Sequence, residues 1–390
     1  MKLSTRICGL TGGGSDGWDV FYRARTMMAA GLPVTELTIG EHDTGTSPEI
    51  LQAMHDAATS GHTGYAMVPG VPALREMVAA RIAERTGVPT GPDNILITPG
   101  GQAALFAAHY AACNPGDRAL FIDPYYATYP GTIRAAGAIP VPVAARPEAN
   151  FQPKAADIAA RAENAASLLI NSPNNPTGVV YSHATLGAIA DVCRDRDLWL
   201  ISDEVYDTQV WSGTHISPRA LPEMSGRTLV VGSMSKSHAM TGSRVGWLVG
   251  PETAIAELIN LSTHTTYGVP GYIQDAAVFA LAQGHAPEAM VAAPFRRRRD
   301  IATEILSQQN IVKMVPADGA MFLMLDIRAT GLTGEGFANA LLDQESIATM
   351  PGESFGRAAA GHVRVAMTRP DGEFGEALGR LVRFAASIAP

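Results

Sequence analysis

The sequence predicts an α/β protein: a three-layer sandwich with a seven-stranded, mostly parallel sheet, and a smaller α+β domain after it. Between about residue 46 and residue 285, short β-branched runs alternate with alanine-rich segments of helical period. Most of these runs are continuously apolar, which is typical of strands covered by helices on both faces. After residue 285 the helical segments become longer and the strands fewer.

The predicted strands and helices follow one another along the chain. The strands of the large sheet lie at residues 95–98, 119–122, 139–143, 168–171, 198–202, 229–232 and 245–249. The helices between them lie at residues 72–85, 102–113, 155–164 and 184–196. Towards the C-terminus we expect helices at 294–309 and 336–344 around strands at 320–326 and 362–366. Ligand-binding residues of such sheets collect just beyond the carboxyl ends of the strands.

This pattern divides the chain into three parts. Residues 46–285 form the large domain, residues 286–390 form the small domain, and residues 1–45 form an N-terminal segment that packs with the small domain. The glycines at 12–14 are interpreted as a flexible entry segment and not as a phosphate loop, because no apolar strand precedes them and no clear helix follows directly.

Composition argues against several classes of function. The net charge of -8 gives no attraction for nucleic acid, and the one basic cluster, Arg296 to Arg299, is most simply a solvated helix face. With no apolar run of membrane-spanning length and no signal-peptide core, we expect a cytoplasmic protein that binds neither membranes nor nucleic acid. Cys8, Cys113 and Cys193 are widely spaced, so neither a disulfide framework nor a metal site is expected.

Lys236 is the most informative residue in the chain. Only four lysines occur, against 25 arginines, and this one lies in the otherwise small and apolar stretch Ser233-Met234-Ser235-Lys236. An imine-forming lysine beside donors for a phosphate dianion is what a pyridoxal phosphate (PLP) enzyme needs. The two serine hydroxyls and Arg244 are such donors. The stretch alone would fit many phosphate sites, and together with the residues that follow it predicts PLP as the cofactor.

Two other predicted strands end in polar residues suited to the pyridine ring. Asp203 ends the strand at 198–202 and, if ionised, would pair with a protonated pyridine nitrogen, although a helix N-cap would also explain it. Tyr206, three residues on, could donate a hydrogen bond to the ring's phenolic oxygen. Asn174 and Asn175 lie in a rigid proline turn after another strand, and one of them could bind that oxygen and a substrate carboxylate.

Two further strand ends offer weaker signals. Gly100-Gly101-Gln102 joins a strand to an alanine-rich helix, whose first N–H groups form a natural phosphate site, although such loops often contain glycine. Tyr125-Tyr126 also follows a strand, and an aromatic face there could stack on the ring, although core packing alone would explain the pair.

Together these residues resemble the class I/II aminotransferases of the aspartate aminotransferase superfamily, the fold-type-I PLP enzymes. The resemblance covers nearly the whole chain in the expected order. It rests on Gly64-Tyr65 with Gly70 and Leu74-Arg75, Asn175-Pro176-Thr177-Gly178, Asp203-Glu204-Val205-Tyr206, Ser233-Met234-Ser235-Lys236 with Arg244, and Val363-Arg364-Val365.

The resemblance implies a role for each of these residues. Lys236 would be the Schiff-base lysine and Asp203 the partner of the pyridine nitrogen, with Tyr206 beside them. The other implied cofactor contacts are Asn175 and Tyr206 on the ring oxygen, Tyr126 on the ring face, and Gly101, Gln102, Ser233, Ser235 and Arg244 on the phosphate. Tyr65 would reach the phosphate of a neighbouring subunit, which implies a homodimer with composite sites.

On the substrate side, Arg364 would clamp the α-carboxylate in a bidentate pair, with Asn175 and Gly40 beside it. Taken alone, Arg364 would be interpreted as a surface charge at a strand edge. The implied activity is a ping-pong transamination between an amino acid and a 2-oxo acid, with the freed amine of Lys236 as general base. The alternatives on the same fold are a carbon–sulfur β-lyase and, less favoured, a non-enzymatic PLP sensor.

Three features bear on the substrate. Gln102 stands where some aspartate-type relatives carry a lysine, and residues 263–267 offer no arginine for a second carboxylate. We therefore expect a neutral or aromatic amino donor. His42 replaces a proline common in the family's Gly-Glu-Pro sequence and is either a neutral loop histidine or a substrate-side contact.

Overall fold

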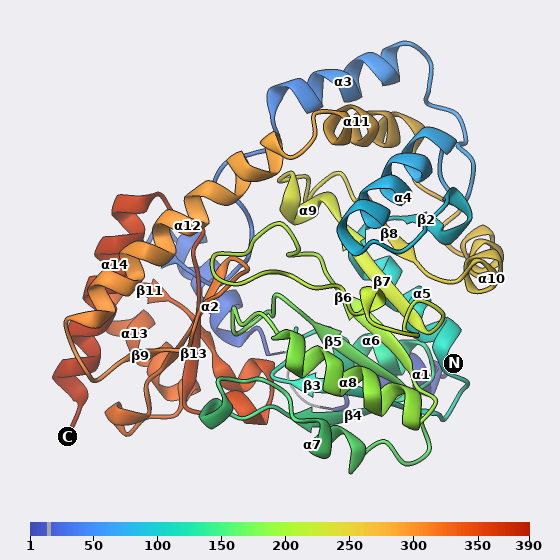
Figure 1. Cartoon of the computed structure of the whole chain (residues 1–390). Coiled ribbons are helices and arrows are strands. Elements are labelled where there is room, and N and C mark those ends of the chain that lie inside the picture. The colour runs from blue at the N-terminus through green and yellow to red at the C-terminus, as the bar shows by residue number, and fades with distance from the viewer. Residues whose placement is uncertain (14–16) are drawn as a thin grey trace.

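A computed structural model describes residues 1–13 and 17–390. Its centre is a seven-stranded sheet with the order β2-β8-β7-β6-β5-β3-β4 (Figure 1). The strands are Ile95–Thr98 (β2), Arg118–Asp123 (β3), Ile139–Ala144 (β4), Ala165–Asn171 (β5), Trp199–Asp203 (β6), Thr228–Ser233 (β7) and Gly246–Val249 (β8). Only β8 runs antiparallel to its neighbours, and every other pair is parallel. The predicted sheet is confirmed.

Helices cover both faces of this sheet, which makes the three layers. They are Pro48–Thr59 (α3), Pro72–Thr86 (α4), Gly100–Ala112 (α5), Tyr129–Ala135 (α6), Ala155–Ala159 (α7), His183–Asp195 (α8), Met234–Ser237 (α9), Glu252–Thr263 (α10) and Gly271–Ala282 (α11). Alternate strand residues enter opposite layers: Leu96 packs with α5 and α10, whereas Ile95 and Ile97 pack with α4 and α11. At the other end of the sheet, α7 and α8 cover the second face.

One predicted helix is wrong over its second half. The helix expected at 155–164 ends at Ala159, because the chain turns through Asn164, which is left-handed at φ 53°, directly into β5. By contrast, α4 ends where a helix should, at a left-handed glycine, Gly87.

The smaller α+β unit is built around a four-stranded antiparallel sheet with the order β12-β13-β10-β9. Its strands are Lys313–Met314 (β9), Phe322–Asp326 (β10), Met350–Pro351 (β12) and His362–Ala366 (β13), and its helices are Ala286–Ser307 (α12), Gly334–Glu345 (α13) and Asp371–Ile388 (α14). Phe295, Phe337 and Phe374 from these three helices fill its core.

The N-terminal residues contact both units. Helix α2 (Asp19–Ala29) packs on α13, and β1 (Thr35–Glu36) pairs in parallel with β11 (Ile347–Ala348). The short helix α1 (Thr5–Cys8) instead contacts α6 of the large unit. The domain boundaries at residues 45 and 285 stay predictions, and Gly14 of the glycine cluster lies outside the described residues.

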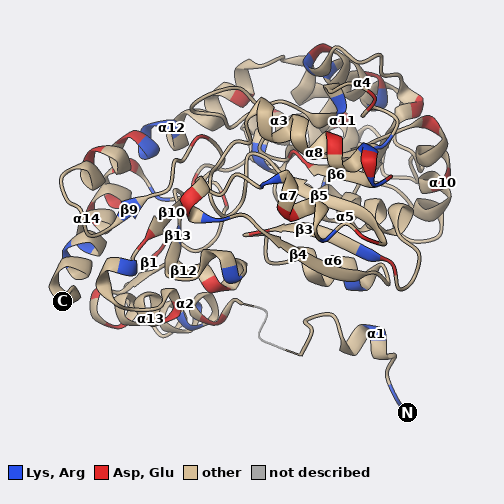
Figure 2. Cartoon of the chain, turned by 60° about the horizontal axis from the view of Figure 1, so that its bottom comes forward, with Lys and Arg blue, Asp and Glu red and all other residues tan. Residues whose placement is uncertain are grey.

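Acidic and basic residues are interspersed over the helices (Figure 2). The expectation of a solvated helix face for Arg296 to Arg299 is wrong for Arg298, whose side chain is buried against Asp43 and Asp371. In residues 1–13 and 17–390 no helix has the length and apolar content to span a bilayer, and no group of three His, Cys, Asp or Glu side chains is arranged to hold a metal ion.

Candidate active site

A cavity of about 310 Å³ lies at the carboxyl ends of β5, β6 and β7, the edge where the strand-end residues were expected to meet. Its walls also include residues of the N-terminal segment and of the small unit. The predicted site residues that line it are Gly40, Gly101, Gln102, Tyr126, Asn175, Asp203, Tyr206, Ser233, Ser235, Lys236, Arg244 and Arg364.

Tyr65 is the one predicted site residue outside this cavity. Its side chain is 93% exposed, and its ring contacts that of Tyr267 edge-on at 5.2 Å between centroids. The role expected for Tyr65, in the site of a neighbouring subunit, stays a prediction.

Asp203 is a buried carboxylate at the end of β6. The hydroxyl of Tyr129 donates to its Oδ2 at 2.7 Å, and the backbone N–H of Val205 donates to its Oδ1 at 3.3 Å. Burial raises the pKa of Asp203 to about 6 despite these two donors. The alternative of a helix N-cap is wrong, because turns follow β6 and not a helix. Sequence reasoning missed Tyr129. Its only signal is that it lies three residues after Tyr126, at the start of α6.

The two successive asparagines have different roles. Asn174 is structural: its Oδ1 accepts hydrogen bonds from the backbone and the hydroxyl of Thr177. Asn175 reaches the cavity, where its Oδ1 accepts from Nη1 of Arg364 at 2.8 Å. Its side chain also hydrogen-bonds with that of Tyr206. Only Asn175 is therefore available to a ligand.

Asn171, at the end of β5, connects two of these residues. It lies directly opposite Asp203 in the register of β5 and β6. Its Nδ2 donates to the backbone carbonyl of Asp203 at 2.9 Å, and its Oδ1 accepts from the backbone N–H of Asn175 at 2.7 Å. Sequence reasoning did not assign it a role.

Lys236 lies on the one-turn helix α9, which follows β7. Ser233 is the N-cap of this helix, and its Oγ accepts a hydrogen bond from the backbone N–H of Ser235 at 3.1 Å. The Nζ of Lys236 donates to the carbonyl of Gly40. Burial lowers the pKa of Lys236 to about 8, and Arg364 and Arg244 act in the same direction against the nearby Glu41. An amine with such a pKa has a substantial unprotonated fraction near neutral pH.

The N-terminus of α5 forms an anion site beside Lys236. Helix α5 has 13 residues and no side-chain cap, so its first N–H groups are open to a ligand. At Gly100, with φ 77°, a Cβ atom would meet Arg244 Nη2 at 2.4 Å, and at Gly246 one would meet the backbone N of Gly101 at 3.0 Å. Only glycines allow the helix end, Arg244 and β8 to approach this closely.

The rest of this anion site consists of hydroxyls. Ser233 Oγ lies 3.0 Å from Ser235 Oγ, and both line the cavity. The side chain of Gln102 is turned away, since its Nε2 donates to Thr132 Oγ1 at 2.7 Å. Its backbone N–H, at the start of α5, is then the group that faces an anion. This donor set fits the phosphate of PLP.

Arg364 is almost completely buried, at 1% exposure, and the interpretation of it as a strand-edge surface charge is wrong. It lies on β13, which is paired on both sides by β10 and β12. Its guanidinium carbon is 4.3 Å from the ring centroids of both Phe322 and Phe355. Besides Asn175, it donates from Nη2 to the carbonyl of Thr38.

No carboxylate of the described residues pairs with this guanidinium, and none of them accepts a hydrogen bond from its Nε. Burial lowers the pKa of Arg364 to about 10. A buried cation without a counter-ion is costly, so the site is set up for an anionic ligand. Gly40 is needed beside it, because a Cβ there would meet Phe322 Cζ at 2.4 Å.

His42 does not line the cavity. Its Nε2 donates to the carbonyl of Lys236 at 3.1 Å, and its ring lies edge-on to Phe295 at 5.3 Å. The geometry does not support the substrate-side contact considered for it. Trp18 and Glu41 do line the cavity and were missed by sequence reasoning.

The comparisons with known proteins agree with this geometry. Residues 33–381 match the model of the family described as aminotransferase class I and II. The arginine–pyruvate transaminase AruH of Pseudomonas aeruginosa is 41% identical over 393 residues, which cover 100% of this chain and 99% of the relative. The aspartate/prephenate aminotransferase of Thermus thermophilus is 34% identical over 366 residues, 93% of each chain.

Solved structures show the same likeness. The aspartate aminotransferase of Thermus thermophilus with maleate superposes with a TM-score of 0.91 at 32% identity, covering 98% of this chain and 99% of that one. The aromatic aminotransferase of Pyrococcus horikoshii superposes with a TM-score of 0.86 at 29% identity, covering 93% and 99%.

Proposed function

As a member of the class I and II aminotransferases, the protein transfers an amino group between an amino acid and a 2-oxo acid with pyridoxal phosphate, and we propose which residues perform this transfer and which donors it accepts. One observation carries the assignment. Three charged side chains, those of Asp203, Lys236 and Arg364, face one cavity, and burial moves the pKa of each towards its neutral form. Such perturbed groups in a cavity are candidates for binding and catalysis.

The site geometry supports a set of proposed cofactor contacts. When bound, PLP supplies an electron sink that stabilises negative charge at the substrate Cα. Asp203 holds the pyridine nitrogen, and Tyr129 orients its carboxylate. The remaining assignments are Lys236 for the covalent link, Asn175 and Tyr206 for the ring oxygen, Tyr126 for the ring face, and Gly101, Gln102, Ser233, Ser235 and Arg244 for the phosphate.

Lys236 also moves the proton. Once its Nζ is free, it would take the proton from the substrate Cα and deliver it to C4′ of the cofactor. A general base works best when its pKa lies near the working pH, and the pKa of about 8 supports this role. Arg364 contributes by binding the α-carboxylate, with Asn175 and Gly40 beside it.

For the donor we propose an amino acid with a neutral or aromatic side chain. The arginines among the described cavity walls are Arg244 and Arg364. In the proposed arrangement the phosphate and the α-carboxylate occupy these two, which leaves no arginine of the described cavity walls for a second carboxylate. A cationic donor is the second candidate, because Glu41 lines the cavity and the relative from Pseudomonas aeruginosa is named an arginine–pyruvate transaminase.

The test is to mix the holoenzyme with single amino acids and follow the absorbance of the bound cofactor. We expect alanine and phenylalanine to convert it to the aminated form faster than aspartate, and pyruvate to reverse the change. Arginine as the fastest donor would favour the second candidate. Release of pyruvate and a thiol from a sulfur-containing amino acid, without an acceptor, would instead support the lyase alternative.

We further propose that the protein works as a homodimer, in which Tyr65 reaches the partner's phosphate, and that it is located in the cytoplasm. The exposed position of Tyr65 outside its own cavity supports the first proposal. Sedimentation of the purified protein tests the dimer.

A further inference from the structure

Two side chains from distant segments donate to one backbone carbonyl, that of Lys236. His42 Nε2 lies 3.1 Å from this oxygen and Gln209 Nε2 lies 3.2 Å from it. Helix α9 ends at Ser237, so it has no following turn to supply a partner for this carbonyl. The two donors therefore satisfy a group that the short helix leaves open.

We propose, on the basis of the role assigned to Lys236 above, that His42 is a positioning residue for the transamination: together with Gln209 it fixes the main chain of Lys236, and so the direction of Nζ. His42 comes from the segment whose Gly40 lies beside Arg364, and Gln209 comes from the turn after Tyr206. The carbonyl of Lys236 thus links α9 to two other parts of the site: the segment with Gly40 beside Arg364, and the turn after Tyr206.

The segment that carries His42 is held against Lys236 on both sides. Before His42, the carbonyl of Gly40 accepts from Lys236 Nζ. After it, Thr46 Oγ1 donates to the carbonyl of Ala239 at 2.7 Å. The backbone around His42 is therefore fixed relative to α9, and a side chain there has a defined distance to the Lys236 carbonyl.

The same segment is attached to the small unit by Asp43. Its carboxylate pairs with Arg298 of α12 through two hydrogen bonds, of 3.0 and 2.6 Å. Arg298 also donates to the carbonyl of Met367 at 2.8 Å and lies almost fully buried. This buried, bidentate pair limits the movement of the backbone next to His42.

The His42 ring has one possible donor in this position. Because a carbonyl must accept, Nε2 carries the hydrogen, and Nδ1 is buried without a partner among the described residues. Burial lowers the pKa of His42 to about 4; Lys236 and Arg298 act in the same direction, and Asp43 and the bond to the Lys236 carbonyl oppose it. The ring is therefore neutral at neutral pH. A proline at position 42 would have no N–H group to donate, and its ring would be too short to contact the Lys236 carbonyl.

The test compares His42→Gln, whose amide nitrogen can occupy the Nε2 position, with His42→Met, which has similar bulk and no donor. We expect kcat of His42→Met to fall about tenfold, which corresponds to the free energy that one hydrogen bond typically contributes. KM for the amino donor should change by less than about twofold. The pH titration of the bound cofactor's absorbance should shift in the same variant. His42→Gln should restore kcat and the titration to within about threefold of the wild type.

A double substitution tests the shared carbonyl. If His42 and Gln209 replace one another in part, His42→Met with Gln209→Met should lower kcat by more than the product of the two single losses. Equal loss in His42→Gln and His42→Met, or an unchanged titration and kcat in His42→Met, would overturn the proposal. If His42→Met does not fold, His42→Asn replaces it, because its shorter amide reaches the Nδ1 position only.

A separate measurement keeps this inference distinct from the assignment of Lys236. Borohydride reduction of the wild-type holoenzyme, followed by peptide mapping, identifies the lysine that carries the cofactor. Labelling of another lysine would refute the proposed function itself. Labelling of Lys236, with kcat unaffected by His42→Met, would refute only the positioning role.

Discussion

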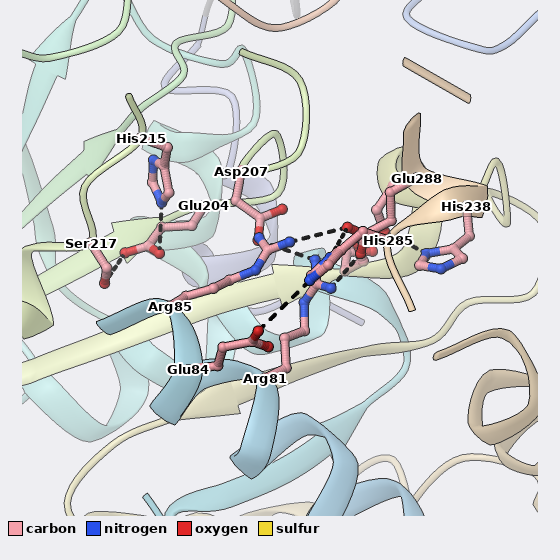
Figure 3. A network of polar contacts seen from close by, with 12 residues as sticks. Arg81, Glu84, Arg85, Glu204, Asp207, His215, Ser217, His238, His285 and Glu288 are labelled. Atoms are coloured by element: carbon pink, nitrogen blue, oxygen red, sulfur yellow. Dashed lines mark hydrogen bonds and ion pairs between the residues drawn. The ribbon is translucent and has the colours of Figure 1, made fainter. Parts of the chain in front are cut away.

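Two charged clusters of this protein differ in how their charges are paired, one lining the cavity and the other partly buried. The first is the cavity cluster of Asp203, Lys236 and Arg364. The second is the arginine network, which we define as Arg81 and Arg85 of α4, Asp207 and Glu288 (Figure 3). Asp207 follows Asp203 by only four residues.

In the arginine network every charge has partners of the opposite sign. Arg81 and Arg85 each contact both carboxylates, so two cations and two anions alternate. Burial alone would raise the pKa of Asp207, but Arg85 and Arg81 outweigh burial and lower it. In the cavity cluster burial prevails, and the pKa of Asp203 rises to about 6. Counter-charges thus lower the pKa of one carboxylate, whereas burial without them raises the pKa of the other.

This difference in charge pairing distinguishes a cluster that stabilises the fold from one that is suited to bind ligands. The network is electrically complete within the chain and needs no ligand. The cavity cluster lacks the counter-charges that a pyridinium nitrogen, a phosphate and a carboxylate would supply, which means that its cost of burial is offset only when cofactor and substrate bind. Substitutions in the two clusters should therefore act on different quantities.

Lys236→Ala should have the largest effect. Without the amine the cofactor has no covalent link and the substrate Cα has no base, so we expect turnover to fall at least about a thousandfold. Borohydride followed by denaturation should release the cofactor from this variant and not from the wild type. Lys154→Ala, an exposed lysine, is the matched control and should keep the link. A retained, reducible link in Lys236→Ala would contradict the assignment.

Glu288→Gln should instead affect stability. It removes the buried carboxylate of the network, leaves Arg81 and Arg85 with Asp207 alone, and should lower the free energy of unfolding by about 3 kcal/mol. We expect kcat of the folded enzyme to stay within about threefold. The matched control is Glu84→Gln. Glu84 is exposed and lies 4.0 Å from His285, a residue that also contacts Glu288, and its substitution should change stability by less than about 0.5 kcal/mol. Loss of kcat without loss of stability in Glu288→Gln would break the comparison.

The sequence predicted the cavity cluster better than the network. Asp203, Asn175 and Lys236 each follow a short apolar run, and parallel strands bring their carboxyl ends to one edge, so local patterns were enough. The network has no such signal. Arg85 and Glu288 are separated by 203 residues and meet only because the fold brings the first turn of α12 to α4. Their pairing depends on the tertiary fold, which short-range patterns do not record.

The same reason explains the other misses. Tyr129 and Asn171 act through partners on different elements, and nothing in their local sequence indicates which carboxylate or amide they contact. Arg364 was expected at a strand edge if taken alone, because one of the two strands beside β13, the two-residue β12, is too short to recognise. The amphipathic helices α2 and α14 were likewise not predicted.

The smallest expected effect is a gain of stability. Burial raises the pKa of folded Asp203 to about 6, from an ordinary value of 3.8. Between these pH values the unfolded chain loses its proton while folded Asp203 keeps it, so the free energy of unfolding falls as pH rises. With the cofactor removed, Asp203→Asn should therefore be more stable than the wild type at pH 8 by roughly 2 kcal/mol, and about equal to it at pH 4.

Urea unfolding of the cofactor-free proteins at these two pH values measures this gain. Asp207→Asn is the variant to compare with Asp203→Asn. The pKa of Asp207 is lowered, so its ionised form stabilises the fold above the unfolded pKa, and its replacement should lower stability at pH 8. The two substitutions, four residues apart, would then change the free energy of unfolding in opposite directions, and the presence or absence of counter-charges alone would explain the difference. With PLP bound, Asp203→Asn should lose its advantage, because Asn cannot stabilise a pyridinium charge. A variant equally stabilised in both states would show that Asp203 does not face the cofactor.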